Sequence, residues 1–356
     1  MERRRTRPVK VGSITIGGGA PVSVQSMTKT HTHDVSATVR QIEELTELGC
    51  EIIRCAVPDA RAARALSDVK KRAPIPLIAD IHFDHRLALR AIDAGVDGVR
   101  VNPATIRNKE GLRAVFRSAA AAGIKVRIGL NSGSVRPRSG LRVKTDTNKT
   151  DVAELMVQEA LKCCRMAETE GCRSLVLSFK ASDVPATIRA YRLAVEQCDY
   201  PFHVGITAAG PPETSLVKSA VGIGALLAEG IGDTIRVSMT GPPHDEVKAG
   251  IAILEALELR GRRGPEIISC PTCGRCTIDL QAIVREVSKR LEGCPKRIRV
   301  AIMGCVVNGP GEAAEADVGI AGGKNFGYIF RRGTKRGKVP ASQLVDALMA
   351  EIEEIP

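Results

Sequence analysis

An alternation of strand and helix patterns constrains the fold of this chain more than any other feature. From residue 22 onward a short apolar run rich in β-forming residues ends in a polar or charged residue, a helical pattern follows, and the unit recurs about eight times. The strands are expected at Val22–Met27, Ile52–Val57, Pro76–Ile81, Gly98–Asn102, Lys125–Asn131, Ser174–Lys180, Phe202–Thr207 and Asp233–Met239. Strands that alternate with helices form parallel βαβ units. The pattern predicts a (β/α)8 barrel of the TIM type. A doubly wound open sheet is the alternative, but no Gly-x-Gly-x-x-Gly turn follows the first strand.

The barrel is expected to end at a basic, glycine- and proline-containing linker, Arg260–Pro265. The two predicted domains are residues 1–260, the barrel, and residues 265–356, a small α+β module. In the small module we expect helices at Thr277–Leu291 and Pro340–Ile355 and strands at Arg299–Met303, Asp317–Gly319 and Asn325–Arg331.

Basic and polar residues gather at the carboxyl ends of the predicted barrel strands, which is where barrels of this type carry their active sites. Alternation along each strand places Arg100 with Asn102, and Arg127 with Asn131, on one face. Cations buried together need an anion to neutralise them, and arginine matches the oxygens of a diphosphate. The chain is therefore expected to bind a diphosphate at the barrel mouth.

A polar stretch, residues 132–150, follows the fifth predicted strand and carries basic residues that include Arg136, Arg138, Arg142 and Lys144. A loop of this length inside a compact domain is unusual, and such loops often act as lids. A surface excursion without function is the alternative.

The composition narrows the functional classes. The net charge of +12 would suit nucleic acid, but the chain has no Trp, three Tyr and six Phe, which leaves few platforms for base stacking. No apolar run is long enough to span a membrane, and no apolar segment follows the basic N-terminus, so a cytoplasmic location is expected. Eleven cysteines in a reducing compartment are expected to be thiols or metal ligands.

The C-terminal module contains the cysteines of greatest interest. Cys270 and Cys273 form a Cys-x-x-Cys pair, and Cys305 lies in the stretch Gly304–Glu312, which contains three glycines. Such thiols could be incidental, or could form a closed zinc site together with Cys294. They could also hold an iron–sulfur cluster with three cysteines, one iron being open or weakly held by the oxygen of Glu312. Cys276 complicates the choice of ligands.

Several motifs resemble the family of 4-hydroxy-3-methylbut-2-enyl diphosphate synthases, iron–sulfur enzymes of the methylerythritol phosphate route to isoprenoids. The resemblance spans essentially the whole chain and is carried by Val22-Ser-Val-Gln-Ser-Met-Thr28, Cys270-Pro-Thr-Cys-Gly-Arg275, Gly304-Cys-Val-Val-Asn-Gly-Pro-Gly-Glu312 and Ala316-Asp-x-Gly-Ile-Ala-Gly-Gly323. It implies a barrel followed by a small iron–sulfur domain with a [4Fe–4S] cluster. It also implies cluster ligands at Cys270, Cys273, Cys305 and Glu312, with Cys276 and Cys294 as bystanders.

The resemblance implies further site residues. Asp80 and Asn308 are expected at the reacting centre, together with Glu312. The substrate-binding residues are expected to be Arg54, Arg100, Asn102, Arg127, Asn131, Lys180, Thr207 and Ser238. One position departs from the family pattern, because Ala208 stands where the family has a glutamate. Loss of a general acid typically costs about 10² to 10⁴ in rate, so the activity of this chain is expected to be reduced unless Asp80 or a water substitutes.

The implied activity is the reductive ring opening and dehydration of 2-C-methyl-D-erythritol 2,4-cyclodiphosphate to 4-hydroxy-3-methylbut-2-enyl diphosphate. The implied partners are flavodoxin or ferredoxin as electron donor and a second copy of the chain in a head-to-tail homodimer. The alternative is a zinc-stapled barrel that binds a phosphorylated ligand or RNA without redox activity. A redox enzyme acting on another substrate, similar to sulfite reductase, would need a haem-type cofactor.

Overall fold

The computed structural model describes residues 2–135, 151–207, 210–306, 311 and 315–355. The chain forms two compact units, Met1–Arg260 and Gly261–Pro356. Within the described residues, no helix is both long enough and apolar enough to cross a membrane.

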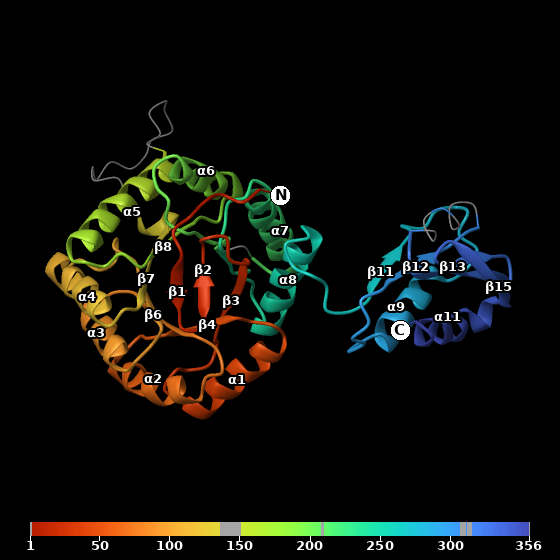
Figure 1. Cartoon of the computed structure of the whole chain (residues 1–356), viewed down its shortest axis with the longest axis horizontal. Coiled ribbons are helices and arrows are strands. Elements are labelled where there is room, and N and C mark those ends of the chain that lie inside the picture. The colour runs from red at the N-terminus through yellow and green to blue at the C-terminus, as the bar shows by residue number, and fades with distance from the viewer. Residues whose placement is uncertain (1, 136–150, 208–209, 307–310, 312–314, 356) are drawn as a thin grey trace. The chain divides into compact units, whose positions relative to one another are not determined.

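The first unit is the predicted parallel barrel (Figure 1). Its strands are β3 (Ser23–Met27), β4 (Ile52–Ala56), β5 (Leu77–Ile81), β6 (Gly98–Val101), β7 (Lys125–Asn131), β8 (Leu175–Lys180), β9 (His203–Val204) and β10 (Thr234–Ile235). They pair in the order β8-β7-β6-β5-β4-β3-β10-β9. A parallel bridge between Leu177 and Phe202 joins the two edges and curls the sheet into a barrel.

A ring of helices surrounds the strands in Figure 1. These helices are α1 (Val35–Glu47), α2 (Ala60–Arg72), α3 (His85–Asp93), α4 (Lys109–Ala121), α5 (Val152–Thr169), α6 (Val184–Val195), α7 (Pro212–Ala228) and α8 (Pro243–Ala256). Side-chain caps start most of them: Asp34 accepts a hydrogen bond from the Ala37 amide, and Asp183 accepts one from Ala186. The apolar faces of the helices pack on the outward residues of the strands and form the main core.

A hairpin that the sequence interpretation missed closes the amino end of the barrel. Strands β1 (Val9–Val11) and β2 (Ile14–Ile16) pair antiparallel through a turn at Gly12, which has φ of +55°. Val11 and Ile16 pack on Ile52 and Ile78, inside the lower part of the barrel. Each strand is only three residues long, too short for an alternation pattern to be recognised.

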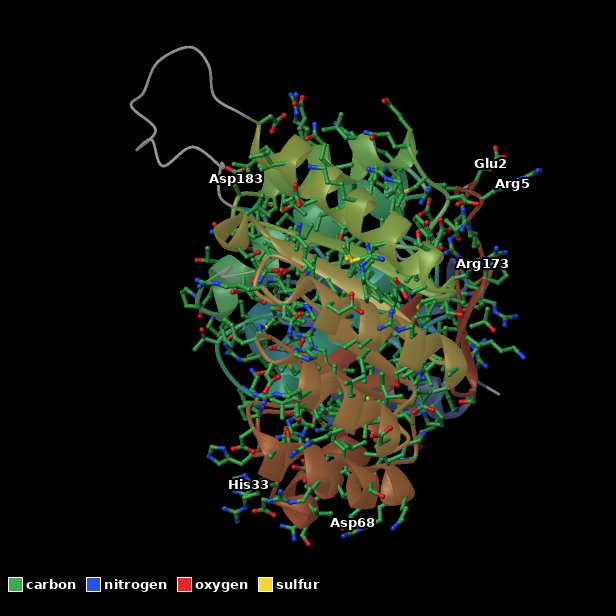
Figure 2. All side chains as sticks on the ribbon, turned by 90° about the vertical axis from the view of Figure 1, so that its left-hand side faces the viewer. Glu2, Arg5, His33, Asp68, Arg173 and Asp183 are labelled. Atoms are coloured by element: carbon green, nitrogen blue, oxygen red, sulfur yellow. The ribbon has the colours of Figure 1, made fainter. Side chains whose placement is uncertain are left out.

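Figure 2 shows the barrel from the side, with the two ends on opposite sides of the view. Glu2, Arg5 and Arg173 lie at the amino end, whereas Asp183 and His33, which follow strands, lie at the carboxyl end. Because the hairpin fills the amino end, a ligand must enter from the carboxyl end.

In its described residues, the second unit is a five-stranded mixed sheet on which helices pack. Strands β11 (Glu266–Ser269), β12 (Arg299–Met303) and β13 (Val318–Gly323) are parallel, and β14 (Phe326–Arg331) and β15 (Thr334–Pro340) continue antiparallel. Helices α9 (Leu280–Arg290) and α11 (Leu344–Glu353) pack on the sheet, and a short 3₁₀ turn, Ala341–Gln343, precedes α11.

The edge strand β15 is a departure from the sequence interpretation, which started the closing helix at Pro340. Its segment carries Lys335, Arg336 and Lys338 instead of alternating apolar residues. Lysines are typical of protected edge strands, and here Lys335 and Lys338 lie over the rings of Tyr328 and Phe326.

Candidate functional site

The interior of the barrel is lined by charged side chains. Arg54, Arg100, Arg127 and Lys180 are all buried. Arg127 on β7 donates a hydrogen bond of 2.5 Å to Oε1 of Gln25 on β3. Since β7 and β3 are not neighbours in the sheet, this bond crosses the interior. The predicted inward face of the strands is therefore the face that the structure turns inward.

Asp80 on β5 lies among basic groups. Its Oδ1 is 3.5 Å from an Arg100 terminal nitrogen, and its Oδ2 is 3.7 Å from Arg54 Nε and 3.3 Å from His82 Nε2. Burial alone would raise the pKa of Asp80, but Arg54, the His82 hydrogen bond and Arg100 together hold that pKa well below its usual range. Asp80 is therefore ionised at neutral pH, and it can orient neighbouring groups but cannot serve as a proton donor.

Glycines make room for the inward cations. A Cβ added at Gly129 would lie 2.7 Å from Arg100 Nε, and one at Gly205 would lie 2.9 Å from Lys180 Nζ. Arg100 also donates to the carbonyl oxygen of Gly129, at 3.1 Å. The glycines are thus part of the site, because any side chain in their place would displace a cation.

Lys180 lies against a buried histidine. Its Nζ is 3.5 Å from His203 Nε2. Burial and the neighbouring Arg127 and Lys180 hold the pKa of His203 well below its ordinary value, so the ring is neutral. Burial and nearby arginines, Arg54 and Arg236 foremost, also lower the pKa of Lys180.

Sequence reasoning missed several charged or polar groups of the interior. Lys125, the first residue of β7, is fully buried, and its Nζ has no hydrogen-bond partner among the described residues. Lys125 lies two residues before Arg127 on the same strand, so strand alternation predicts that both side chains point inward. Glu246 of α8 was also missed: it is buried and forms a 3.1 Å ion pair with Arg236, which strand alternation cannot reveal.

The charges of the described interior do not balance. Two carboxylates, Asp80 and Glu246, face a larger set of basic groups. The basic groups are Arg54, Arg100, Lys125, Arg127, Lys180 and Arg236. Burial and mutual repulsion lower the pKa of Arg54 to about 10 and that of Arg127 well below its ordinary value. Such an excess of buried positive charge is stabilised by a multivalent anion.

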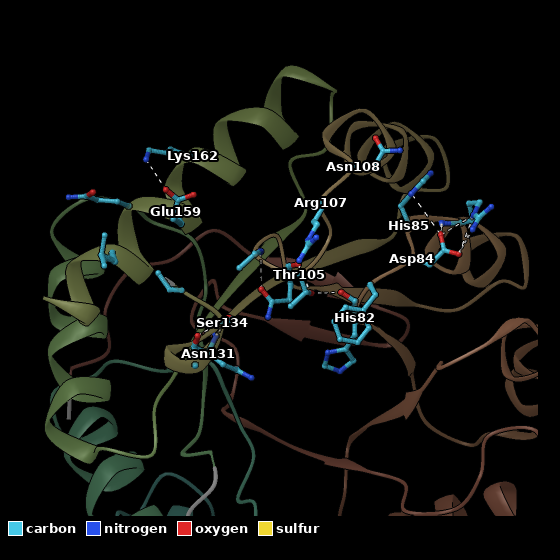
Figure 3. A pocket seen from close by; sticks show the side chains of 18 residues that line it. His82, Asp84, His85, Thr105, Arg107, Asn108, Asn131, Ser134, Glu159 and Lys162 are labelled. Atoms are coloured by element: carbon cyan, nitrogen blue, oxygen red, sulfur yellow. Dashed lines mark hydrogen bonds and ion pairs between the residues drawn. The ribbon is translucent and has the colours of Figure 1, made fainter. Parts of the chain in front are cut away.

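A groove of about 1460 Å³ opens beside the barrel mouth (Figure 3). Asn102, Asn131 and His82 line it, and the Thr105 hydroxyl donates to the His82 carbonyl oxygen. Phe83 also lines the groove, with 76% of its surface exposed. His82 lines the groove and contacts buried Asp80, so it links the groove to the charged interior.

The other two predicted substrate residues follow the short strands β9 and β10. Thr207 is half-buried, and its amide donates to the Ala181 carbonyl oxygen at 3.3 Å. Ser238 is also half-buried and lies two residues after Arg236. Both strands are shorter than predicted, and a Cβ at Gly205 would lie only 2.5 Å from the Arg236 carbonyl oxygen.

The predicted cysteines lie in two loops of the second unit. Cys270 follows β11 and Cys305 follows β12, and these strands are neighbours. The Gly304 amide donates to Cys270 Sγ at 3.3 Å, the kind of bond that tunes a cluster thiolate. Among the described residues no group of three or more metal-ligating side chains is already gathered. The soft thiolates and the N–H···S bond nevertheless fit an iron–sulfur cluster.

Some predicted residues lie outside the described part of the chain. These are Asn308 and Glu312 of the cysteine loop, Ala208, and residues 136–150 of the long loop.

Comparisons with known proteins match both units. The GcpE TIM-barrel domain model matches residues 6–251, and the GcpE protein C-terminal domain model matches residues 266–354. A protein of Geobacter sulfurreducens is 50% identical over 353 residues, which cover 99% of this chain and 98% of that protein. One of Dehalococcoides mccartyi is 50% identical over 355 residues and covers all of both chains. Both are named 4-hydroxy-3-methylbut-2-en-1-yl diphosphate synthase (flavodoxin).

The solved structures that match this chain share only its fold. Dihydropteroate synthase of Xanthomonas albilineans matches with a TM-score of 0.52 and 14% identity, covering 71% of this chain and 97% of that one. The enzyme of Yersinia pestis matches with a TM-score of 0.51 and 12% identity, covering 71% and 99%. Both family models match, and the full-length relatives are 50% identical, in agreement with the sequence motifs. This chain therefore belongs to the GcpE family, that of the 4-hydroxy-3-methylbut-2-en-1-yl diphosphate synthases.

Proposed function

We propose that this chain carries out the reaction for which its relatives are named. It converts 2-C-methyl-D-erythritol 2,4-cyclodiphosphate to 4-hydroxy-3-methylbut-2-enyl diphosphate by reductive ring opening and loss of water. The observation that carries the proposal is the excess of buried cations in the barrel, because a diphosphate is the counter-anion that such an interior needs. Family membership does not favour the zinc-stapled alternative.

The diphosphate binds to the inward cations Arg54, Arg100, Arg127 and Lys180. Arginine forks bind phosphate oxygens with two parallel hydrogen bonds, and each charge-assisted bond is stronger than a neutral one. Burial, and after it repulsion from the other arginines, lowers the pKa of Arg54 and Arg127. Binding of the diphosphate offsets the repulsion, so the protonated forms are stabilised in the complex.

Polar side chains at the mouth hold the polyol part of the substrate. Asn102, Asn131, Thr207 and Ser238 offer amide and hydroxyl groups at four different strand ends. Asp80 keeps Arg54 and Arg100 in place, as its contacts of 3.7 and 3.5 Å support. A fixed array of this kind orients the substrate before reaction.

A proton is needed to release water, and Asp80 is a poor donor because its pKa lies far below neutral pH. His82, whose Nε2 is 3.3 Å from Asp80, lines the groove, and imidazole is a common proton carrier in enzymes. We propose that His82 holds this proton, because this chain has Ala208 at the position where the family has a glutamate.

The proposed cluster ligands are Cys270, Cys273, Cys305 and Glu312, with Asn308 facing the substrate. The N–H···S bond from Gly304 to Cys270 supports the thiolate part of this set. When bound, a [4Fe–4S] cluster supplies electrons one at a time and a Lewis-acidic iron.

The proposed partners follow from the relatives' names and from charge. An acidic donor such as flavodoxin, or a ferredoxin, suits a chain with a net charge of +12. We also propose a head-to-tail homodimer, in which the cluster of one copy serves the barrel of the other.

Anaerobic reconstitution followed by turnover tests the function. The protein is loaded with iron and sulfide, mixed with the cyclic diphosphate and a reductant, and the product is identified by mass spectrometry. Lys180→Met, which keeps the aliphatic stem but removes the charge, is expected to lower kcat/KM by about 10- to 100-fold. Lys10→Met, at an exposed position of β1, is the matched control and is expected to be unchanged. Unaltered substrate with fully loaded wild-type protein would refute the proposal.

A further inference from the structure

Cys276, which the resemblance leaves without a role, lies beside the proposed cluster ligand Cys270. Its Sγ is 2.5 Å from the position that a Cβ on Gly304 would occupy, and Cys270 Sγ is 3.5 Å from the same point. These sulfurs and the Cys276 Cβ are the heavy atoms nearest that point. Two thiols therefore share the space left by the missing side chain of Gly304.

Hydrogen bonds to the backbone of Gly304 hold the Cys270 side chain and Thr277, the residue that follows Cys276. The Gly304 amide donates to Cys270 Sγ at 3.3 Å, and the Gly304 carbonyl oxygen accepts from the Thr277 amide at 3.1 Å. The Cys276 amide donates to the Cys273 carbonyl oxygen at 2.9 Å, which closes the turn between them. The proximity of the two thiols thus follows from fixed backbone on both sides.

Cys273, in the same loop as Cys270, is placed differently. Cys273 is exposed, whereas Cys270 and Cys276 are half-buried and pack against the same apolar cluster under the sheet. Cys276 Sγ also contacts the Ile278 carbonyl oxygen at 3.3 Å, which orients its side chain. Of the cysteines in this loop, Cys276 is the partner that the geometry favours for Cys270.

We propose that Cys276 is the resolving thiol for Cys270 when the cluster is absent. Hydrogen peroxide oxidises the Cys270 thiol to a sulfenic acid. The O–O bond breaks, one oxygen stays on the sulfur, and the other leaves as water. The Cys276 sulfur then attacks the Cys270 sulfur, the S–O bond breaks, and a second water leaves as the Cys270–Cys276 disulfide forms. The two thiols together lose two electrons and two protons, and one peroxide becomes two waters.

The disulfide would preserve the site. A sulfenic acid that meets no thiol proceeds to sulfinic acid, which a simple thiol does not reverse, whereas a disulfide is reduced by thiol exchange. This role rests on the proposed function in one respect only, namely that Cys270 is a cluster ligand worth preserving. The pairing itself can be measured without a cluster.

The test uses metal-free, full-length protein. Hydrogen peroxide is added anaerobically, at one equivalent to detect the disulfide and at several-fold excess to detect sulfinic acid, free thiols are alkylated, and peptides are identified by mass spectrometry. The Cys270–Cys276 crosslink is expected as the main disulfide, and dithiothreitol should reverse it. In Cys276→Ser the sulfinic form of Cys270 should rise several-fold, whereas the matched control Cys294→Ser should behave as wild type. A main crosslink from Cys270 to Cys273 or Cys305, or a Cys276 that stays alkylatable, would overturn the proposal.

A second measurement separates this inference from the proposed function. Wild type and Cys276→Ser are reconstituted with iron and sulfide, and their iron content and electron paramagnetic resonance spectra are compared. Equal content and spectra are expected, because Cys276 is not a ligand. Loss of iron in the variant alone would make Cys276 a ligand and refute the inference. Failure of wild type to take up iron would refute the proposed function and leave the crosslink result standing.

Discussion

Replacement of Arg54 by methionine should stabilise the ligand-free barrel while weakening anion binding. Burial, then repulsion from Arg236 and Arg100, lowers the pKa of Arg54 to about 10 despite the attraction of Asp80. That value lies about 2.5 below the ordinary one, and at 1.36 kcal/mol for each pH unit the charged side chain costs about 3 kcal/mol. A cation whose pKa falls on folding exerts this cost at every pH below its folded pKa, so the cost is complete at pH 7.

The net gain should be smaller than this figure. Asp80 loses Arg54 but keeps Arg100 at 3.5 Å and His82 at 3.3 Å, so it is not left without partners. Methionine also fills most of the space of the arginine stem. We expect the ligand-free barrel of Arg54→Met to gain about 1 to 3 kcal/mol.

Hydrogen exchange of the β4 and β5 amides is the suitable assay, because it reports on the barrel and not on the second unit. Each gain of about 1.4 kcal/mol should slow exchange tenfold if these amides exchange by global opening of the barrel. Added inorganic pyrophosphate should protect the wild type, with binding about 10- to 100-fold weaker in the variant.

Arg64→Met is the matched control, since Arg64 is exposed on α2. It should change stability by less than about 0.5 kcal/mol and leave pyrophosphate binding intact. A less stable ligand-free Arg54→Met barrel that binds pyrophosphate as tightly as wild type would refute the reasoning.

Three further predictions follow from the same geometry. Gly205→Ala places a Cβ 2.9 Å from Lys180 Nζ, so the free energy of unfolding measured in denaturant should fall by about 1 to 3 kcal/mol. The matched control Gly224→Ala has no neighbour within 4 Å of the added Cβ and should leave stability unchanged or raise it. Asp80→Asn should cost about 3 kcal/mol at pH 7. Because the pKa of Asp80 is held low, its contribution is lost as the pH falls below about 4, so the difference from wild type should shrink there; a difference constant with pH would contradict the assigned ionisation. Cys305→Ser should lower the iron retained after anaerobic reconstitution, and unchanged retention would remove Cys305 from the ligand set.

The barrel and its cationic mouth were predictable because strong local periods encode both. The strand–helix alternation predicted all eight strands of the ring, and alternation along β6 and β7 predicted that Arg100 and Arg127 point inward. The packing of Asp80 between Arg54 and Arg100 was open at the sequence level, because their spacing depends on strand register.

Other features of the fold leave no periodic pattern in the sequence. Glu246 reaches Arg236 from helix α8, and only the three-dimensional fold brings the two together. Lys125 and His203 are buried at the first residues of β7 and β9, away from the strand ends at which active-site residues of a barrel are expected. Strand β15 was not predicted, because its basic residues replace the alternation of apolar and polar residues that is typical of a strand. The proximity of Cys276 to Cys270 depends on Gly304, which is distant in the sequence from both.

The central claim is that a cation-lined barrel and a cysteine-held cluster act in one reaction. Anaerobic turnover of 2-C-methyl-D-erythritol 2,4-cyclodiphosphate by protein of measured iron and sulfide content tests it most directly. The account predicts brown protein with iron and sulfide in equal amounts, and formation of 4-hydroxy-3-methylbut-2-enyl diphosphate with two electrons consumed for each product. Colourless, zinc-containing protein that folds fully and returns the cyclic diphosphate unchanged would contradict it.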